Sequence, residues 1–329
     1  MNVFEQIVRE IGEYDGTAVI DRGRRISYPQ LLQSVRSCAA RLSGAGLKPG
    51  MRAGIIAEDS FEYIALSLAV LSLNAAIVPL STRASEEELR SMPEKVGINV
   101  LLCNAEHRRG NEAELPAPDF FRDPFFFRIR DPEIRPVKLP DGRIPAFIRF
   151  SSGTTGENKG VVLSHQAVLE RTDACAPGLG VVRGEHVLWV LDMAFHFVVT
   201  ILLFLRKGAA LVICGRPIES GMREAFRKVP LSLLYATPYH YRLMAHSDDF
   251  PPECLRTVRL AVSTAMKLDA ADGEAFRKKF GRPLAQAYGI IEIGLPCVNA
   301  SADPAKAASV GALQEAFDVQ ILNPDSEGK

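Results

Sequence analysis

Short β-rich runs alternate with amphipathic segments of helical period along most of this sequence. TAVID (17–21) and AGIIAE (53–58) are typical of buried strands, whereas residues 27–46 and 60–76 repeat their apolar side chains at helical spacing. Consecutive parallel strands need a crossover connection, which is usually a helix. The order of the segments therefore predicts mostly parallel sheets.

The alternation is interrupted by a polar, proline-rich stretch from Ala105 to Gly142. We expect this stretch to be a connection, with the cluster Phe125 to Phe127 packed on the core. We therefore predict an α/β fold made of βαβ-type subdomains, whose mostly parallel sheets pack together. Further strand-like runs after the interruption are GVVLS (160–164), GAALVIC (208–214), LSLLYATP (231–238), VRLAVS (258–263) and PLAQAYG (283–289).

The composition is that of an ordinary globular protein. The 329 residues suffice for more than one packed unit, and Lys plus Arg equals Asp plus Glu at 39 each, so no net charge favours nucleic acid. Two apolar stretches, Tyr63–Leu80 and Val187–Leu205, approach the length of a membrane span. Because Asn74 interrupts one, and Asp192 and His196 the other, we expect buried segments of the core and no membrane span.

The cysteines and the two ends of the sequence bear on its cellular setting. Six cysteines lie far apart without metal-ligand spacing, which indicates reduced thiols. The amino terminus, MNVFEQIVREIGEYDG, lacks the apolar core of a signal peptide, so we expect a cytoplasmic protein. The sequence ends on a strand-like run and a turn, ASVGALQEAFDVQILNPDSEGK, which indicates a part of something longer.

The stretch SSGTTGENKG (151–160) directly follows the apolar run PAFIRF. Its glycines let backbone amides approach an anion, its hydroxyls add donors, and Lys159 adds a cation suited to phosphate. The order of glycine and lysine differs from that of a Walker A loop, and strand-like runs lie on both sides. The stretch predicts a phosphate-binding loop, with a flexible surface hairpin as the alternative.

The loop with its flank, SSGTTGENKGVVLSH, resembles the signature loop of the adenylate-forming superfamily, which includes acyl-CoA synthetases, amino-acid-activating adenylation domains and luciferases. AFHF around His196 resembles the family's aromatic-histidine segment. AVSTAMKLDA from Ala261 resembles its nucleotide-lining segment, and QAYGIIEIG from Gln286 resembles its YGxTE element. These segments follow in the family's order over essentially the whole chain, although each residue alone also fits an ordinary structural role.

The resemblance implies a role for each matching residue. Tyr288 stacks on the adenine, His196 shapes the pocket for the carboxylate substrate, and Glu292 holds Mg²⁺ together with Thr155. Lys159, Glu292 and His196 are the implied catalytic residues. The residues implied to bind ATP are Ser151, Ser152, Gly153, Thr154, Thr155, Gly156 and Lys159 at the phosphates, and Ser263, Thr264, Ala265, Tyr288 and Gly289 at the adenine.

The resemblance also implies a reaction. Members of the family join a carboxylic acid to AMP from ATP, release pyrophosphate, and pass the acyl group to CoA or to phosphopantetheine on an acyl carrier protein. The apolar residues around His196 favour a fatty or aromatic acid. Asp192 could instead pair with a substrate ammonium, which leaves an amino acid open as the alternative.

Two departures from the family's pattern leave a nucleotide-binding or carrier-interacting module with impaired catalysis as a further alternative. Ile291 replaces the threonine of YGxTE, and losing that contact to phosphate costs about 1.5 to 3 kcal/mol. The family's TGD element, hinge and small carboxyl-terminal domain are expected beyond Lys329. The implied domains are an adenylation core over 1–297 and the start of a β-rich subdomain over 298–329; Asn158, in place of a proline, is a milder departure.

Overall fold

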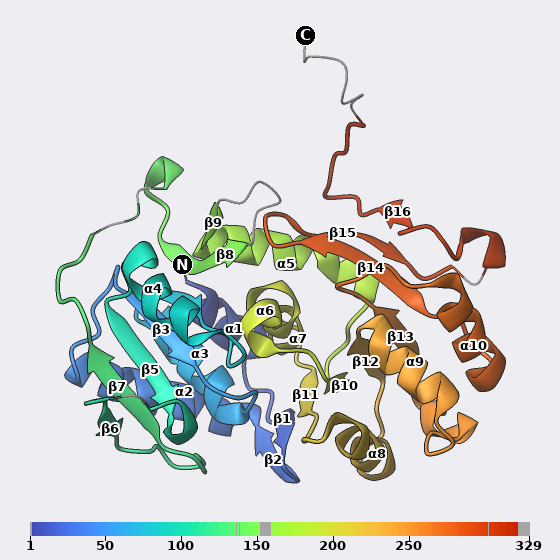
Figure 1. The fold of residues 1–329 in the computed structure, drawn as a ribbon, viewed down its shortest axis with the longest axis horizontal. Helices are drawn as coiled ribbons and strands as arrows, with labels where there is room; N and C mark the ends of the chain where they lie inside the picture. Colours follow the sequence, from blue (N-terminus) through green and yellow to red (C-terminus); the bar gives the residue numbers. More distant parts are fainter. Residues whose placement is uncertain are drawn as a thin grey trace.

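Two β-sheets with helices between and around them form the fold (Figure 1). The computed structural model describes residues 2–108, 110–135, 137, 139–151, 159–301 and 303–321. Apolar residues of both sheets belong to one large core, for example Val100 in the smaller sheet and Val187 in the larger. The predicted α/β architecture with mostly parallel sheets is confirmed.

The larger sheet contains nine strands within the described residues, in the order β16-β15-β14-β13-β12-β10-β11-β1-β2. Its central strands from β14 to β1 are parallel, and antiparallel strands flank them at both edges. The strands are β1 (Thr17–Asp21), β2 (Arg24–Ser27), β10 (His186–Trp189), β11 (Ala210–Ile213), β12 (Leu233–Ala236), β13 (Leu260–Ser263), β14 (Ala285–Ile290), β15 (Gly294–Asn299) and β16 (Ala312–Leu313).

The smaller sheet contains seven strands in the same described ranges, in the order β6-β7-β5-β3-β4-β8-β9. Its centre, from β5 to β8, is parallel, whereas β6, β7 and β9 are antiparallel to their neighbours. The strands are β3 (Arg52–Ile56), β4 (Ala76–Pro79), β5 (Val100–Asn104), β6 (Ala113–Leu115), β7 (Phe125–Ile129), β8 (Pro145–Ser151) and β9 (Lys159–Ser164).

The helices begin at the capping side chains that the sequence supplies. Ser27 and Gln30 form a capping box at α2, while the hydroxyls of Ser60 and Ser164 accept the backbone N–H of Tyr63 and Ala167 at the starts of α3 and α5. The helices are α1 (Val3–Ile11), α2 (Tyr28–Gly44), α3 (Phe61–Ser72), α4 (Glu86–Val96), α5 (His165–Leu179), α6 (Met193–His196), a π-helical turn (Phe197–Ile201), α7 (Leu202–Arg206), α8 (Ile218–Lys228), α9 (Pro238–His246) and α10 (Ala270–Phe280), with short 3₁₀ turns at Ala105–His107, Pro140–Gly142, Pro252–Leu255 and Pro304–Lys306.

Both apolar stretches of near-membrane length lie in the interior. The first forms most of α3, which is buried from Phe61 to Leu71 and contacts β1 of one sheet and β4 of the other. The second divides into β10, α6, the π-helical turn and α7. Within the described ranges, no helix combines the length and apolar character that a bilayer crossing requires.

The expected connection between Ala105 and Gly142 contains two strands, β6 and β7. The phenylalanine cluster Phe125 to Phe127 is the first part of β7, and all three side chains are buried, which confirms its predicted packing. The run of three adjacent aromatic residues has no strand alternation, because both faces of β7 are covered at this point. For that reason the pattern did not predict the strand.

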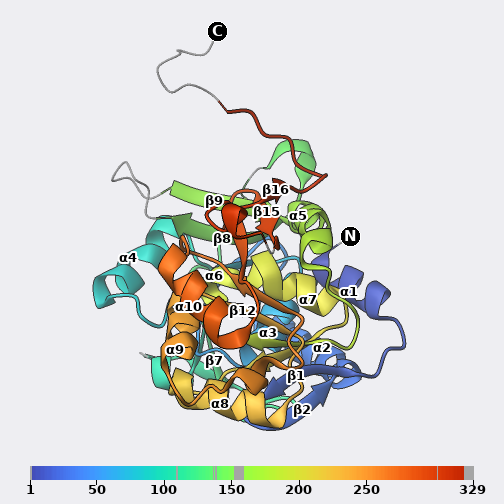
Figure 2. The ribbon, with the colours of Figure 1, turned by 90° about the vertical axis from the view of Figure 1, so that its right-hand side faces the viewer.

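Helix α5 links the two sheets at the end of the molecule where β8, β9 and β15 lie (Figure 1). It contacts β8 and β9 of the smaller sheet and β15 of the larger. The view turned by 90° places the same strands together with β16 at this end (Figure 2). The functional side chains expected from the sequence are carried by these strands and by their neighbours.

Candidate functional site

The predicted phosphate loop connects the antiparallel strands β8 and β9. Ser151 and Lys159 are paired across the last register position of this hairpin, so the two strands end side by side. The predicted residues Ser152, Gly153, Thr154, Thr155 and Gly156 lie outside the described residues, as do the side chains of Ser151 and Lys159.

The predicted adenine-binding residues lie on two neighbouring parallel strands. Ser263 ends β13 and is paired with Gln286 of β14, so Thr264 and Tyr288 both lie beyond this pairing at the carboxyl ends. The Thr264 hydroxyl donates to the carbonyl of Ala287 and accepts from the Tyr235 hydroxyl, both at 3.4 Å. The sheet thus fixes these residues next to one another.

Three features characterise this edge of the sheet. The ring of Tyr288 is 46% exposed at the end of β14. Ala265 is exposed and has a left-handed φ of 69°, which is unfavourable for a side chain with a Cβ. The Ser263 hydroxyl is buried and has no hydrogen-bond partner among the described residues. The exposed aromatic face suits a flat group such as a purine.

The β14–β15 hairpin carries Glu292 at its turn, where the side chain is exposed. A Cβ on Gly289 would lie 2.4 Å from the carbonyl oxygen of Gly294, so glycine is required for this close approach. Arg171 of α5 donates to the carbonyl of Ile291 at 2.6 Å, and the Ile291 side chain packs partly against the core. The turn is therefore held to α5 on one side while Glu292 faces outward.

His196 ends the short helix α6 beyond the carboxyl end of β10. Its ring meets the ring of Trp189 edge-on, with 5.9 Å between the centroids. Burial, and in second place the positive charge of Arg149, lowers the pKa of His196 to about 4. The imidazole is therefore neutral near pH 7, and it can shape a pocket without contributing a charge.

Arg149 of β8 joins the separate parts of the site. Its guanidinium lies 4.3 Å from the ring centroid of Phe195 and donates to the Phe195 carbonyl at 3.4 Å. Burial lowers the pKa of Arg149, and the charges of Asp192 and Glu292 act in the opposite direction. The charges of Asp192 and Glu292 are therefore close enough to Arg149 to influence its protonation.

Two carboxylates support α6 from different sheets. Asp59, which follows β3, accepts the backbone N–H of Met193, and Asp192 accepts that of Ala194, both at 2.9 Å. Burial raises the pKa of Asp59 to about 7, with the charge of Asp192 acting in the same direction, and burial also raises the pKa of Asp192. Near neutral pH, Asp59 is thus poised between its two protonation states.

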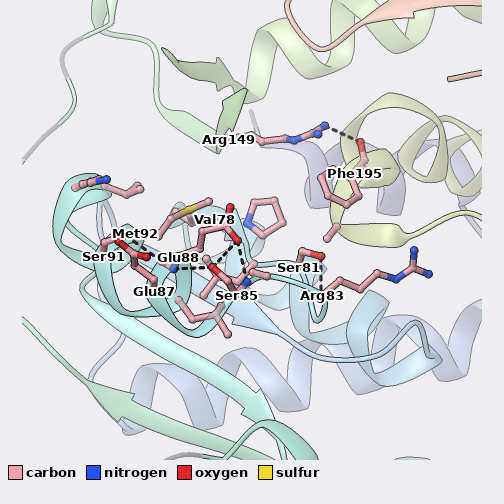
Figure 3. Close-up of a pocket in the computed structure, with 17 residues that line it drawn as sticks. Val78, Ser81, Arg83, Ser85, Glu87, Glu88, Ser91, Met92, Arg149 and Phe195 are labelled. Carbon is pink, nitrogen blue, oxygen red and sulfur yellow. Dashed lines mark hydrogen bonds between the residues drawn. The ribbon is translucent and has the colours of Figure 1, made fainter. Parts of the chain in front are cut away.

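A cavity of about 540 Å³ lies beside Arg149 and Phe195 (Figure 3). Arg149 and Phe195 border it on one side, and α4 with the residues after β4 borders it on the other. Its wall combines charged and apolar side chains, so it can accommodate a ligand with both characters. The lining includes Arg83, Glu87, Glu88 and Lys95 together with Val78, Leu89 and Met92. Thr264 and Tyr288 do not line it.

The structure thus places the predicted residues in two groups. One group contains His196 and Glu292 around Arg149, and the other contains Ser263, Thr264, Ala265, Tyr288 and Gly289 on β13, β14 and the residues that follow them. The sequence reasoning missed Arg149, although a lone charge inside the apolar run PAFIRF was a signal. It assigned no functional role to Asp59, and nothing in the pattern indicated Arg171.

Comparison with known proteins gives one consistent family. The profile of the AMP-binding enzyme family matches residues 9–329. The 3-hydroxybenzoate--CoA/4-hydroxybenzoate--CoA ligase of Thauera aromatica is 25% identical over 350 residues, which cover 98% of this chain and 66% of the ligase. Bacitracin synthase 3 of Bacillus licheniformis is 28% identical over 250 residues, which cover 74% of this chain and 4% of the synthase.

Among solved structures, ATP-bound MatB from Rhodopseudomonas palustris has the same fold. The TM-score is 0.76 at 20% identity, over 91% of this chain and 62% of MatB. The chain therefore spans less than two thirds of the length of each of these three proteins.

Proposed function

The chain belongs to the AMP-binding enzyme family, and on that premise we propose that it activates a carboxylic acid as an acyl adenylate. An oxygen of the substrate carboxylate attacks the α-phosphorus of ATP, and the bond from that phosphorus to the bridging oxygen of pyrophosphate breaks. The products are the acyl adenylate and pyrophosphate. We further propose that, together with a domain like the family's carboxyl-terminal one, a thiol of CoA or of carrier-bound phosphopantetheine then takes the acyl group and releases AMP.

The observation that carries this proposal is the convergence at Arg149. Residues 149 and 195 are far apart in the sequence, yet the Arg149 guanidinium lies 4.3 Å from the ring centroid of Phe195 and donates to the Phe195 carbonyl. The nearby charges of Asp192 and Glu292 favour the charged form of Arg149. Two anions must meet in this reaction, so a cation on β8, the strand that leads to the phosphate loop, supports it. Positioning and electrostatic stabilisation account for catalysis, and no protein nucleophile is required.

Each predicted residue has a proposed role at the nucleotide or at the acid. The phosphate loop from Ser151 to Lys159 holds the phosphates, and Tyr288 stacks on the adenine. Glu292 offers an exposed carboxylate, the kind of hard oxygen ligand that Mg²⁺ prefers, and Thr155 is its proposed partner. When bound there, Mg²⁺ would supply neutralisation of phosphate charge. His196 borders the acid.

A fatty or aromatic acid is the proposed substrate class. The ring of Trp189 meets the ring of His196 edge-on, and the next two residues, Phe197 and Val198, are buried apolar side chains. We further propose the division into an adenylation core over 1–297 and a β-rich subdomain that starts at 298. A cytoplasmic location remains a prediction of the proposal.

Calorimetric titration with MgATP tests the proposal, with wild type compared with Lys159→Ala. Removal of a charged contact to phosphate should weaken binding by about 10- to 150-fold, from about 1.5 to 3 kcal/mol. Lys48→Ala, at an exposed lysine between α2 and β3, is the matched control and should bind as wild type does. Equal affinities of wild type and Lys159→Ala would contradict the assignment of the loop.

Pyrophosphate exchange in the longer protein then separates activation from binding alone. Exchange that depends on a fatty or aromatic acid supports the proposed reaction, whereas exchange with an amino acid would assign Asp192 to a substrate ammonium. MgATP binding without exchange by any acid would favour the impaired module. Ile291 supports that second candidate, because its side chain packs partly on the core and offers no hydroxyl.

A further inference from the structure

Glu58, Glu106 and His107 form a group of possible metal ligands that the proposed reaction does not use. One ligand atom from each of these three side chains lies within 4.8 Å of the other two. Among the described residues, no other group of three His, Cys, Asp or Glu side chains does so. The group belongs to the smaller sheet, whereas Glu292 lies at a turn of the larger one.

The topology explains why these three side chains meet. Glu58 follows β3, and Glu106 with His107 forms the 3₁₀ turn directly after β5. The strands β3 and β5 are parallel neighbours, with Ile56 paired to Cys103, so their carboxyl ends adjoin. The Asn104 side chain accepts the backbone N–H of His107 at 3.3 Å and thereby fixes the turn.

The imidazole of His107 is directed toward a carboxylate that it does not reach. Its Nε2 lies 3.6 Å from Oε1 of Glu58, is buried, and has no hydrogen-bond partner among the described residues. A charge-assisted hydrogen bond would bring these atoms to about 2.7 to 2.9 Å. The distance from Nε2 to Oε1 is thus too long for a direct hydrogen bond. A cation bound between the nitrogen and the carboxylate would provide both atoms with a partner.

We propose that Glu58, Glu106 and His107 bind a divalent cation of the Zn²⁺ type. One imidazole nitrogen and two carboxylate oxygens match the ligands that this ion prefers, and the two negative charges balance its charge. Zn²⁺ lies about 2 Å from each ligand, which requires ligand atoms within about 4 Å of one another. The three atoms lie within 4.8 Å of one another, so binding requires them to approach by about 1 Å at most. Glu106 is exposed, so the ion has a path of entry.

The position of the site gives the ion a role in holding the fold near the candidate active site. Glu58 is adjacent to Asp59, whose carboxylate accepts the Met193 N–H at the start of α6. Helix α6 ends at His196. An ion that ties Glu58 to the end of β5 therefore restrains the connection that supports α6. It acts on structure, and the proposed reaction does not depend on it.

Calorimetric titration of the chelator-treated chain with ZnCl₂ alone tests this site. Wild type should bind one ion, and His107→Gln and Glu106→Gln should each weaken binding by more than about tenfold. His246→Gln and Glu114→Gln remove an exposed histidine and an exposed glutamate elsewhere, and both should bind as wild type does. Circular dichroism checks the fold of each variant, and Glu106→Gln keeps the test valid if His107→Gln unfolds.

Thermal unfolding supplies a second measurement. Zn²⁺ should raise the midpoint of wild type and of the two control variants, but not that of Glu106→Gln, because an ion that binds only the folded state stabilises it. The proposal is overturned if wild type shows no saturable binding of Zn²⁺. It is also overturned if Glu106→Gln and a folded His107→Gln bind the ion as tightly as wild type, since the ion would then lie elsewhere.

Discussion

At the scale of single residues, Tyr288 allows the most direct test of the nucleotide site. Tyr288 is 46% exposed near the end of β14, and Thr264, which follows β13, donates to the carbonyl of the preceding residue, Ala287. Loss of a stacking ring costs about 1 to 3 kcal/mol, so Tyr288→Ala should weaken MgATP binding by about 5- to 150-fold. Tyr288→Phe should retain most of the affinity, because the ring remains. Titration calorimetry measures both.

Tyr239→Ala is the control for this substitution. Tyr239 is 63% exposed on α9 and is expected to make no contact with the nucleotide. A Tyr288→Ala protein that binds MgATP like wild type, or a Tyr239→Ala protein that loses affinity, would show that the adenine does not lie on β14.

Sequence patterns predicted the site residues that belong to motifs. They did not predict the residues whose roles depend on contacts between distant segments. His196, Tyr288 and Glu292 were named because they stand in ordered motifs. Arg149 and Asp59 were missed in their present roles because these depend on contacts between strand ends of different sheets. Such contacts leave no regular spacing in the sequence.

At the scale of elements, His165 joins the first residues of two helices. It begins α5, and its Nδ1 accepts the backbone N–H of Val3 in α1 at 3.2 Å. Burial is the main cause that lowers its pKa from 6.5 to about 4. The unfolded chain therefore takes up a proton as the pH falls below about 6.5, while folded His165 does so only near 4, and the free energy of unfolding decreases over this interval.

His165→Asn should remove this contribution. The free energy of unfolding of wild type relative to the variant should fall as the pH drops from about 6.5 to 4, by at most about 1.4 kcal/mol per pH unit. Urea denaturation at several pH values measures it. His246→Asn, at an exposed site on α9, should follow wild type. A constant difference between wild type and His165→Asn would show that the folded imidazole is freely protonated.

Elements with a clear period were predicted, and those without one were not. The strands on both sides of residues 151–160 and the helices within 27–46 and 60–76 follow from apolar patterns, and the structure contains them as β8, β9, α2 and α3. The strand β7 was taken as part of a connection, since its three adjacent phenylalanines do not alternate. Its place depends on pairing with β5, which local sequence does not encode.

At the scale of the whole molecule, the two sheets should unfold together. They contribute to one apolar core, and α3 lies between β1 and β4. Trp189, the single tryptophan of the sequence, is buried in β10 of the larger sheet. The urea midpoint from its fluorescence should equal the midpoint from hydrogen exchange of β3 and β5 in the smaller sheet.

Trp189→Phe is the control that assigns the fluorescence change to the larger sheet. Two separate midpoints in wild type would mean that the core seen here divides into independent folding units. Coincident midpoints would mean that a substitution in either sheet lowers the stability of both.

Helix α5 starts where β9 ends, because Ser164 is both the last residue of that strand and the cap of the helix. Two turns later, Arg171 holds the carbonyl of Ile291 in the turn that carries Glu292. No flexible linker separates the hairpin from the helix, so a displacement of β9 is carried to that carbonyl. If binding of an anion at the hairpin changes the affinity of Glu292 for its ligand, linkage requires that this ligand change the affinity for the anion by the same factor.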